Sequence, residues 1–224
     1  MGPPHFLGWG LIALVLGTPA VFAAEAAEDC VVIEDFAKAT IGEFPPDWKV
    51  RKAEGKRVYT VQEEGGRRFL RAVSGGTGIQ AAKPSEWDLN RYPVLVWSWR
   101  AHEFPSGANE KDGKNDSVLA VYMLVPYSAV RGPTAVKYIW SERVPVGTRL
   151  ESNWGLTKVR VLESGTERRG QWVEERVNVR DDYLSYFGER EVPTPAGIAV
   201  LTDSDDTASS ARGDVAALRA CGTK

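Results

Sequence analysis

Apolar and polar residues alternate with a period of two along much of the chain, the pattern of β-strands that have one face in a core and the other in water. Gly65 and Gly66 separate two such segments and predict a hairpin turn, since glycine adopts positive φ without steric cost. Half-exposed strands are predicted over residues 31–36, 47–50, 56–63, 67–74, 134–141, 156–162 and 171–179.

Three further segments are apolar on nearly every position, which is typical of strands covered on both faces. They span residues 94–102, 118–125 and 197–201, and the last of them runs directly into a group of carboxylates and hydroxyls. A final strand is predicted over residues 213–219. These buried segments are expected to lie at the centre of the sheets, with the alternating segments around them.

Residues 181–188 predict the one helix. Asp181 is a suitable N-cap, an apolar stripe follows it, and Gly188 is expected to end the helix. One short helix among about ten strands is typical of a β-sandwich. We therefore predict an all-β fold, an antiparallel β-sandwich of the jelly-roll or galactose-binding-like kind with one short helix.

Composition and the N-terminal segment place this sandwich outside the cytoplasm. The chain has 224 residues, 43% of them hydrophobic, and a net charge of -2 without a basic stripe, which argues against nucleic acid as a partner. Residues 1–24 lack charged side chains and contain a short apolar run, so we predict a cleaved signal peptide, with an uncleaved anchor as the alternative. The expectation is one domain over residues 30–222, periplasmic or secreted, with no membrane association after cleavage.

The chain contains two cysteines, Cys30 and Cys221, near the two ends of the predicted domain. Exported proteins fold in oxidising compartments where disulfides persist. We predict that the two residues form a disulfide, which requires the first and last strands to be neighbours. Two unrelated free thiols are the alternative.

The acidic loop after residue 201 is the strongest candidate for a cation site, because calcium takes oxygen ligands from Asp, Glu, backbone carbonyls and water. An EF-hand is excluded, since Ala208 stands where the turn-forming glycine belongs and no helices flank the loop. The alternative is a turn held by its own side-chain hydrogen bonds, with Arg212 pairing one carboxylate. The predicted calcium ligands are Asp203, Asp205, Asp206, Asp214 and Asp35.

Aromatic side chains are the second chemical resource of the chain. Planar rings flanked by polar groups suit the binding of sugar rings, although large aromatics also fill the core of a sandwich. His102 is the one histidine beyond the predicted signal peptide, which excludes a multi-histidine zinc site. The residues predicted to bind a ligand are Tyr138, Trp140, Trp154 and Arg212.

Several strings from residue 92 onward resemble a known family of exported bacterial proteins, DUF3047. They include the Trp97-Ser98-Trp99 strand, the Tyr138-Ile139-Trp140 strand, the helix Asp182-Tyr183 to Phe187-Gly188 and the loop Thr202 to Thr207. The resemblance covers essentially all of the chain after the predicted signal peptide. It implies an exported, single-domain, β-rich protein and supplies no activity.

The function expected from these patterns is that of an exported, non-catalytic β-sandwich that binds a carbohydrate or another cell-envelope polymer. Two alternatives stay open. One is a carboxylate-dependent, glycosidase-like hydrolase, which needs two carboxylates facing each other across a cleft. The other is a structural component of the cell envelope.

Overall fold

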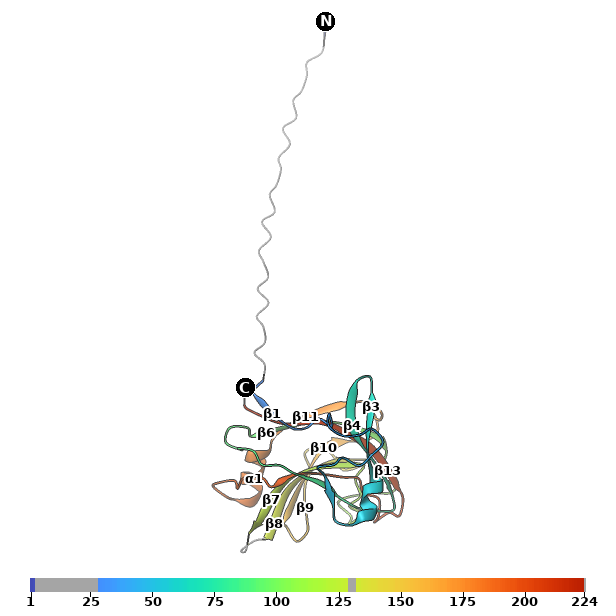
Figure 1. The fold of residues 1–224 in the computed structure, drawn as a ribbon, viewed down its shortest axis with the longest axis vertical. Helices are drawn as coiled ribbons and strands as arrows, with labels where there is room; N and C mark the ends of the chain where they lie inside the picture. Colours follow the sequence, from blue (N-terminus) through green and yellow to red (C-terminus); the bar gives the residue numbers. More distant parts are fainter. Residues whose placement is uncertain (3–27, 129–131, 224) are drawn as a thin grey trace.

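Two β-sheets packed face to face make up the body of the protein (Figure 1). The computed structural model describes residues 1–2, 28–128 and 132–223, so nearly all of the predicted signal peptide lies outside the described residues. Within those ranges no helix has the length and apolar character needed to cross a bilayer. The β-sandwich predicted from the hydrophobic pattern is confirmed.

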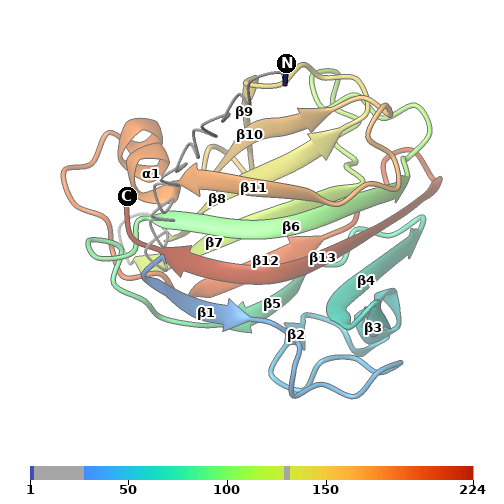
Figure 2. The same cartoon turned by 90° about the horizontal axis from the view of Figure 1, so that it is seen from above.

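The first sheet has six strands, and β13, the last strand of the chain, lies inside it. One edge of β13 pairs with β6, while the other edge pairs with β4 over its first half and with β1 over its second half (Figure 2). The strands are β11 (Val173–Asn178), β6 (Val94–Glu103), β13 (Ser210–Cys221), β4 (Arg67–Gly75), β3 (Tyr59–Glu64) and β1 (Cys30–Glu34).

The second sheet has seven strands, and its centre holds the apolar segments that precede the acidic loop. In spatial order they are β2 (Lys49–Val50), β5 (Ala81–Pro84), β12 (Gly197–Leu201), β7 (Leu119–Ser128), β8 (Gly132–Ser141), β10 (Thr157–Ser164) and β9 (Arg149–Ser152). The prediction of wholly antiparallel sheets is wrong for one pair, since β10 runs parallel to β8. After β8 the chain first forms β9 at the edge of the sheet and then turns back as β10, which lies between β9 and β8. Because of this extra turn, β10 runs in the same direction as β8.

The helical segments differ from the prediction in detail. The expected helix is α1 (Val179–Phe187); its N-cap is Asn178, whose side chain accepts a hydrogen bond from the Asp181 amide, and Gly188 ends it with a φ of 65°. The sequence pattern did not reveal the 3₁₀ helix η1 (Ala53–Val58) or the short strands β5 and β9. With four to six residues each, such elements are too short to show a period.

Aromatic rings fill the space between the two sheets. Trp97 and Trp99 of β6 meet Tyr138 and Trp140 of β8 with ring-centroid distances of 5.6 and 5.8 Å, and all four side chains have no exposed surface. Offset and tilted ring pairs of this kind stabilise a core beyond the burial of their area. The buried phenol of Tyr138 donates to Asp182 of α1 at 2.9 Å, which ties the helix to the sandwich.

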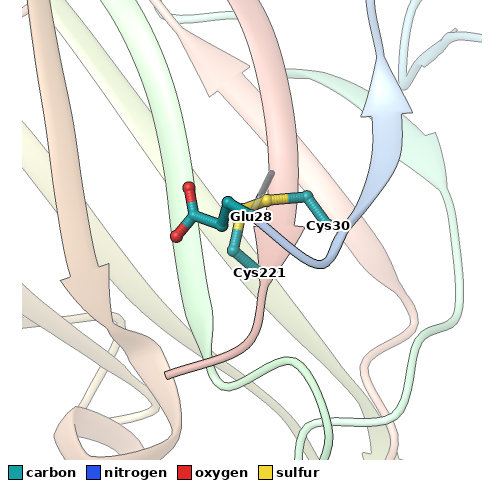
Figure 3. Close-up of side chains that lie close together, drawn as sticks. All are labelled: Glu28, Cys30 and Cys221. Atoms are coloured by element: carbon teal, nitrogen blue, oxygen red, sulfur yellow. A yellow bond between two sulfur atoms is a disulfide. The ribbon is translucent and has the colours of Figure 1, made fainter. Parts of the chain in front are cut away.

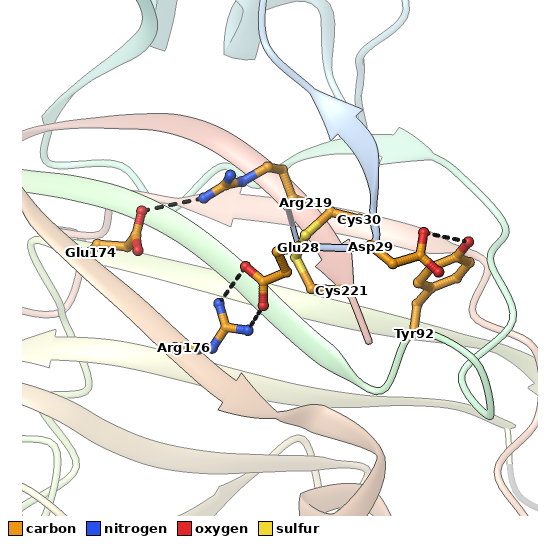
Figure 4. Close-up of a disulfide and its surroundings, with 8 residues drawn as sticks. All are labelled: Glu28, Asp29, Cys30, Tyr92, Glu174, Arg176, Arg219 and Cys221. Carbon is orange, nitrogen blue, oxygen red and sulfur yellow. Dashed lines mark hydrogen bonds and ion pairs between the residues drawn. A yellow bond between two sulfur atoms is a disulfide. The ribbon is translucent and has the colours of Figure 1, made fainter. Parts of the chain in front are cut away.

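The predicted disulfide between Cys30 and Cys221 is confirmed. The two cysteines are directly paired in the β1–β13 ladder, and the bridge packs on Val94 and Val96 at the outer face of β6. Glu28 lies beside the bridge (Figure 3), but its carboxylate accepts hydrogen bonds from Arg176 (Figure 4). Disulfide sulfurs offer no thiolate, so this group is a covalent staple with an ion pair beside it rather than a metal site.

A carboxylate inside the sandwich gives the stability a pH dependence. Glu175 accepts a hydrogen bond from the Trp99 indole at 3.1 Å, and burial, together with the nearby Glu163, raises the pKa of Glu175 to about 7. The folded protein therefore keeps a proton that the unfolded chain loses above its ordinary pKa, so stability falls as the pH rises from about 4.5 to about 7. The full penalty applies above that range.

We expect Glu175→Gln to remove this penalty, because the amide keeps the hydrogen bond to Trp99 and carries no charge. After discounting for the part of the side chain that water reaches, the gain is about 1 to 2 kcal/mol at about pH 8 and close to zero at about pH 5. Urea unfolding at both pH values measures it. Glu174→Gln, which alters the exposed neighbour paired with Arg219, is the control; it should show no gain at about pH 8 and should keep the pH profile of the unsubstituted protein. Equal pH profiles for Glu175→Gln and the unsubstituted protein would contradict the assignment.

Candidate functional site

A groove of about 980 Å³ lies on the face of the seven-stranded sheet that points away from the other sheet. Its floor is apolar, because Tyr122 and Leu124 of β7, Ala135 of β8 and Leu201 of β12 alternate with residues that point into the core. Its walls carry polar and charged groups from loops, including Arg51, Lys52, Gln80, Ser152 and Asn153. An apolar floor with a polar rim is the usual composition of a small-molecule or polymer site.

Trp154 directly follows Asn153, one of the residues that line the groove. Its side chain is 96% exposed, and both residues have a φ of 53° in the tight turn between β9 and β10. Asparagine tolerates this left-handed conformation, whereas a bulky side chain there costs about 1 to 2 kcal/mol. Trp154 therefore combines backbone strain with full exposure, and packing gives no reason for an indole at this position.

The acidic loop lies next to the groove, where β12 ends. Asp203 and Asp205 from this loop meet Asp116 from the loop before β7, and one oxygen from each carboxylate lies within 4.8 Å of the other two. We call these three residues the aspartate cluster. Gly78, which lines the groove, forms a β-bridge with Asp203, so the cluster and the groove share a wall.

Buried charges surround the aspartate cluster. Burial raises the pKa of Asp203 to about 7; Asp205 and Asp116 act in the same direction, and the Lys137 ammonium opposes them. Lys137 is itself buried on the groove side of β8, beside Tyr122, its partner in the β7–β8 ladder. Burial disfavours the charged lysine, but Tyr122 and Asp203 raise its pKa above the ordinary value.

Asp214, another of the predicted calcium ligands, is not part of the aspartate cluster. It belongs to β13 on the outer face of the six-stranded sheet, where it is fully buried and accepts hydrogen bonds from Arg71, Arg100 and His102 at 2.7 to 3.1 Å. Burial acts to raise the pKa of Asp214, but these three donors lower it overall. A carboxylate neutralised in this way has no free charge for a cation.

The remaining predicted cation ligands are also separate from the aspartate cluster. Asp35 is exposed and accepts a hydrogen bond from the Ala37 amide in the turn after β1. Asp206 is exposed and accepts hydrogen bonds from the backbone and side chain of Asn115. Sequence reasoning missed Asp116, because it stands some ninety positions before the acidic loop and no spacing rule connects the two segments.

Two of the four predicted ligand-binding residues lie in the core rather than at the groove. Tyr138 and Trp140 have no exposed surface and donate their polar hydrogens to Asp182 and to the Gly165 carbonyl, so no ligand can stack on them. Arg212 is exposed on β13, in the other sheet from the groove, and forms no ion pair with any residue in the described ranges. Trp154 alone lies beside the groove.

These features define a class of protein: a two-sheet β-sandwich with a disulfide between the paired strands β1 and β13 and an open groove on one sheet. The chain belongs to the family described as "Protein of unknown function (DUF3047)", whose model matches residues 46–219. This confirms the resemblance inferred from the tryptophan strands and the acidic loop. A search of curated proteins finds no match.

Solved structures with a similar arrangement include carbohydrate-active proteins. A carbohydrate-binding module specific for non-crystalline cellulose, CBM28, matches with a TM-score of 0.43 and 14% identity over 87% of this chain and 96% of the module. A cellulase derived from Cel12A of Rhodothermus marinus matches with a TM-score of 0.39 and 13% identity over 77% and 94% of the two chains. Endoglucanase 3 of Trichoderma harzianum matches with a TM-score of 0.38 and 14% identity over 90% of this chain and 100% of the endoglucanase. Similarity at this level assigns no function.

Proposed function

We propose that this protein is an exported, non-catalytic β-sandwich that binds a glycan of the cell envelope in the groove on its seven-stranded sheet. The observation that carries the proposal is Trp154, a fully exposed indole in a strained turn whose residues Asn153 and Thr157, on either side of it in the sequence, line an apolar-floored groove. An indole face packs on the apolar face of a sugar ring, and side chains at the rim bond its hydroxyls. The disulfide supports export, because such bridges persist in oxidising compartments.

The charges around the groove indicate which glycans fit. Arg51 and Lys52 at its wall are exposed and form no ion pair with a described residue, and none of its described lining residues is a carboxylate. An unopposed pair of cations attracts ligands of negative charge. We therefore expect an acidic polysaccharide, one that carries carboxylates on its sugar rings, to bind more tightly than a neutral polymer.

The same geometry favours binding over hydrolysis. A glycosidase of the common kind needs two carboxylates on either side of the glycosidic bond, about 5 to 9 Å apart. None of the described lining residues of the groove is a carboxylate, and Asp203 of the aspartate cluster, which pairs with the lining residue Gly78, is only 7% exposed. A carboxylate so deeply buried does not reach a sugar that lies in the groove.

Affinity electrophoresis in gels that contain a soluble polysaccharide tests the proposal. We expect polygalacturonate to retard the protein and a neutral cellulose ether to retard it less. Trp154→Ala should weaken this retardation at least about tenfold, equivalent to about 1.4 kcal/mol of binding free energy. The stability of the protein should hardly change, because the side chain buries almost nothing in the fold.

Two variants serve as controls. Trp154→Phe keeps an aromatic ring at the rim and should retain most of the binding, whereas Val73→Ala removes an exposed apolar side chain from the other sheet and should have no effect. The absence of retardation by any polysaccharide, including soluble fragments of peptidoglycan, would overturn the proposal. Equal loss in Trp154→Ala and Val73→Ala would do the same.

A further inference from the structure

The aspartate cluster holds a buried oxygen atom that has no hydrogen-bond partner among the residues that the structure describes. Asp203 is only 7% exposed, and its Oδ1 atom has neither solvent contact nor a hydrogen-bond partner within the described residues. Leaving a buried carboxylate oxygen unpaired is costly, more so than for a neutral group. Such an orphaned acceptor needs a proton or a cation nearby.

The free oxygens point into one space above Gly78. A Cβ atom on Gly78 would collide with Oδ1 of Asp203 and would lie 3.1 Å from Oδ2 of Asp205. The missing side chain of this glycine therefore makes room for two carboxylates from another loop to converge. Asp205 is exposed on its outer side, which leaves the space open to solvent.

Asp116 completes the arrangement from a third loop. Its carboxylate accepts hydrogen bonds from the backbone amides of Asp206 and Thr207 at 3.2 and 2.8 Å, and from the Thr207 hydroxyl at 2.6 Å. These bonds fix its orientation and leave one lone pair free on Oδ1, since each carboxylate oxygen has two. Three loops, those before β5, before β7 and after β12, thus meet at the cluster.

We propose that Asp116, Asp203 and Asp205 form a binding site for a hard divalent cation, calcium in particular, with water completing the coordination. Ligand oxygens lie about 2.3 to 2.6 Å from calcium, so two of them are at most about 5 Å apart, which the mutual distances within 4.8 Å satisfy. Three carboxylates supply more negative charge than the nearby Lys137 neutralises. The cation would fasten the three loops together at the wall of the groove.

Calcium titration of the chelator-treated protein, followed by calorimetry and by thermal unfolding, tests this inference. We expect one calcium ion per chain and a rise in Tm of about 5 to 10 °C at saturating millimolar calcium. Asp205→Asn should weaken calcium binding at least about tenfold and abolish the rise in Tm. This variant is suitable because the Asp205 side chain is exposed and accepts no hydrogen bond from a backbone amide or a basic side chain within the described residues.

Asp206→Asn is the matched control, since it alters the adjacent carboxylate in the same loop, which bonds Asn115 and stands outside the cluster. This variant should keep the full response to calcium. The inference fails if neither calcium nor magnesium changes the Tm of the unsubstituted protein, which would indicate that a proton satisfies Asp203. It also fails if Asp206→Asn and Asp205→Asn lose the response equally.

Discussion

Replacing Asp214 with asparagine is expected to destabilise the protein by about 3 to 5 kcal/mol, a large share of the stability of a typical domain. The carboxylate is fully buried on the outer face of the six-stranded sheet and is the shared partner of Arg71 and Arg100. An amide of the same shape leaves these two guanidinium groups without the charge that compensates them. Urea unfolding of the disulfide-bonded protein measures the loss.

The partner of Arg100 at the surface provides the control for Asp214. Glu64 pairs with Arg100 at 2.7 Å, but its side chain is 63% exposed, so Glu64→Gln should cost at most about 1 kcal/mol. Comparable losses of stability in Asp214→Asn and Glu64→Gln would show that burial does not strengthen the ion pairs of Asp214.

Acid titration gives a second measure of the same group. The pKa of Asp214 is lowered in the folded protein. Its contribution to the free energy of unfolding is therefore complete at pH values above the ordinary pKa of a carboxyl group, and it disappears as the pH falls through the folded-state pKa. Asp214→Asn should therefore flatten the acid end of the stability profile.

Loss of the Cys30–Cys221 disulfide is expected to cost about 4 to 5 kcal/mol, because the bridge joins residues 191 positions apart and restricts the unfolded chain accordingly. Urea unfolding with and without a reductant measures this difference. The slope of the unfolding free energy against urea should also increase on reduction, since the unfolded chain exposes more surface once it is no longer a loop.

The double variant Cys30→Ala/Cys221→Ala distinguishes the bridge from side effects of the reductant. Its stability should equal that of the reduced protein and should not respond to reductant. A loss below about 1 kcal/mol would mean that the β1–β13 ladder holds the two ends together in the unfolded ensemble as well.

The hydrophobic pattern predicted the sandwich well, because most strands follow a simple rule: β6 and β7 are apolar on both faces and are central, while β3 and β4 alternate. The pattern failed where tertiary contacts decide. The direction of β10 depends on the path of the chain around β9, and the 3₁₀ helix η1 occupies residues whose continuation into β3 made them look like strand.

The candidate site was less predictable, since its residues come from distant parts of the sequence. The acidic loop was recognised as an unusual feature, but sequence proximity wrongly grouped Asp214 with Asp203. Asp203 follows β12 of the seven-stranded sheet, whereas Asp214 belongs to β13 of the six-stranded sheet. The chain therefore crosses from one layer of the sandwich to the other between these two residues, although they are close in the sequence. Likewise, exposure separates Trp154 from Trp140, and nothing in the residues beside them in the sequence distinguishes a rim indole from a core indole.

The position of β13 has a consequence for how the chain folds. This strand comes last among the described strands, yet β1, β4 and β6 all require it as a partner, one of them across 191 residues. Contacts between such distant segments slow folding, because loop closure precedes any stabilising contact. The six-stranded sheet therefore cannot be completed before β13 has been synthesised. Until then the edges of β1, β4 and β6 that β13 covers have no partner strand.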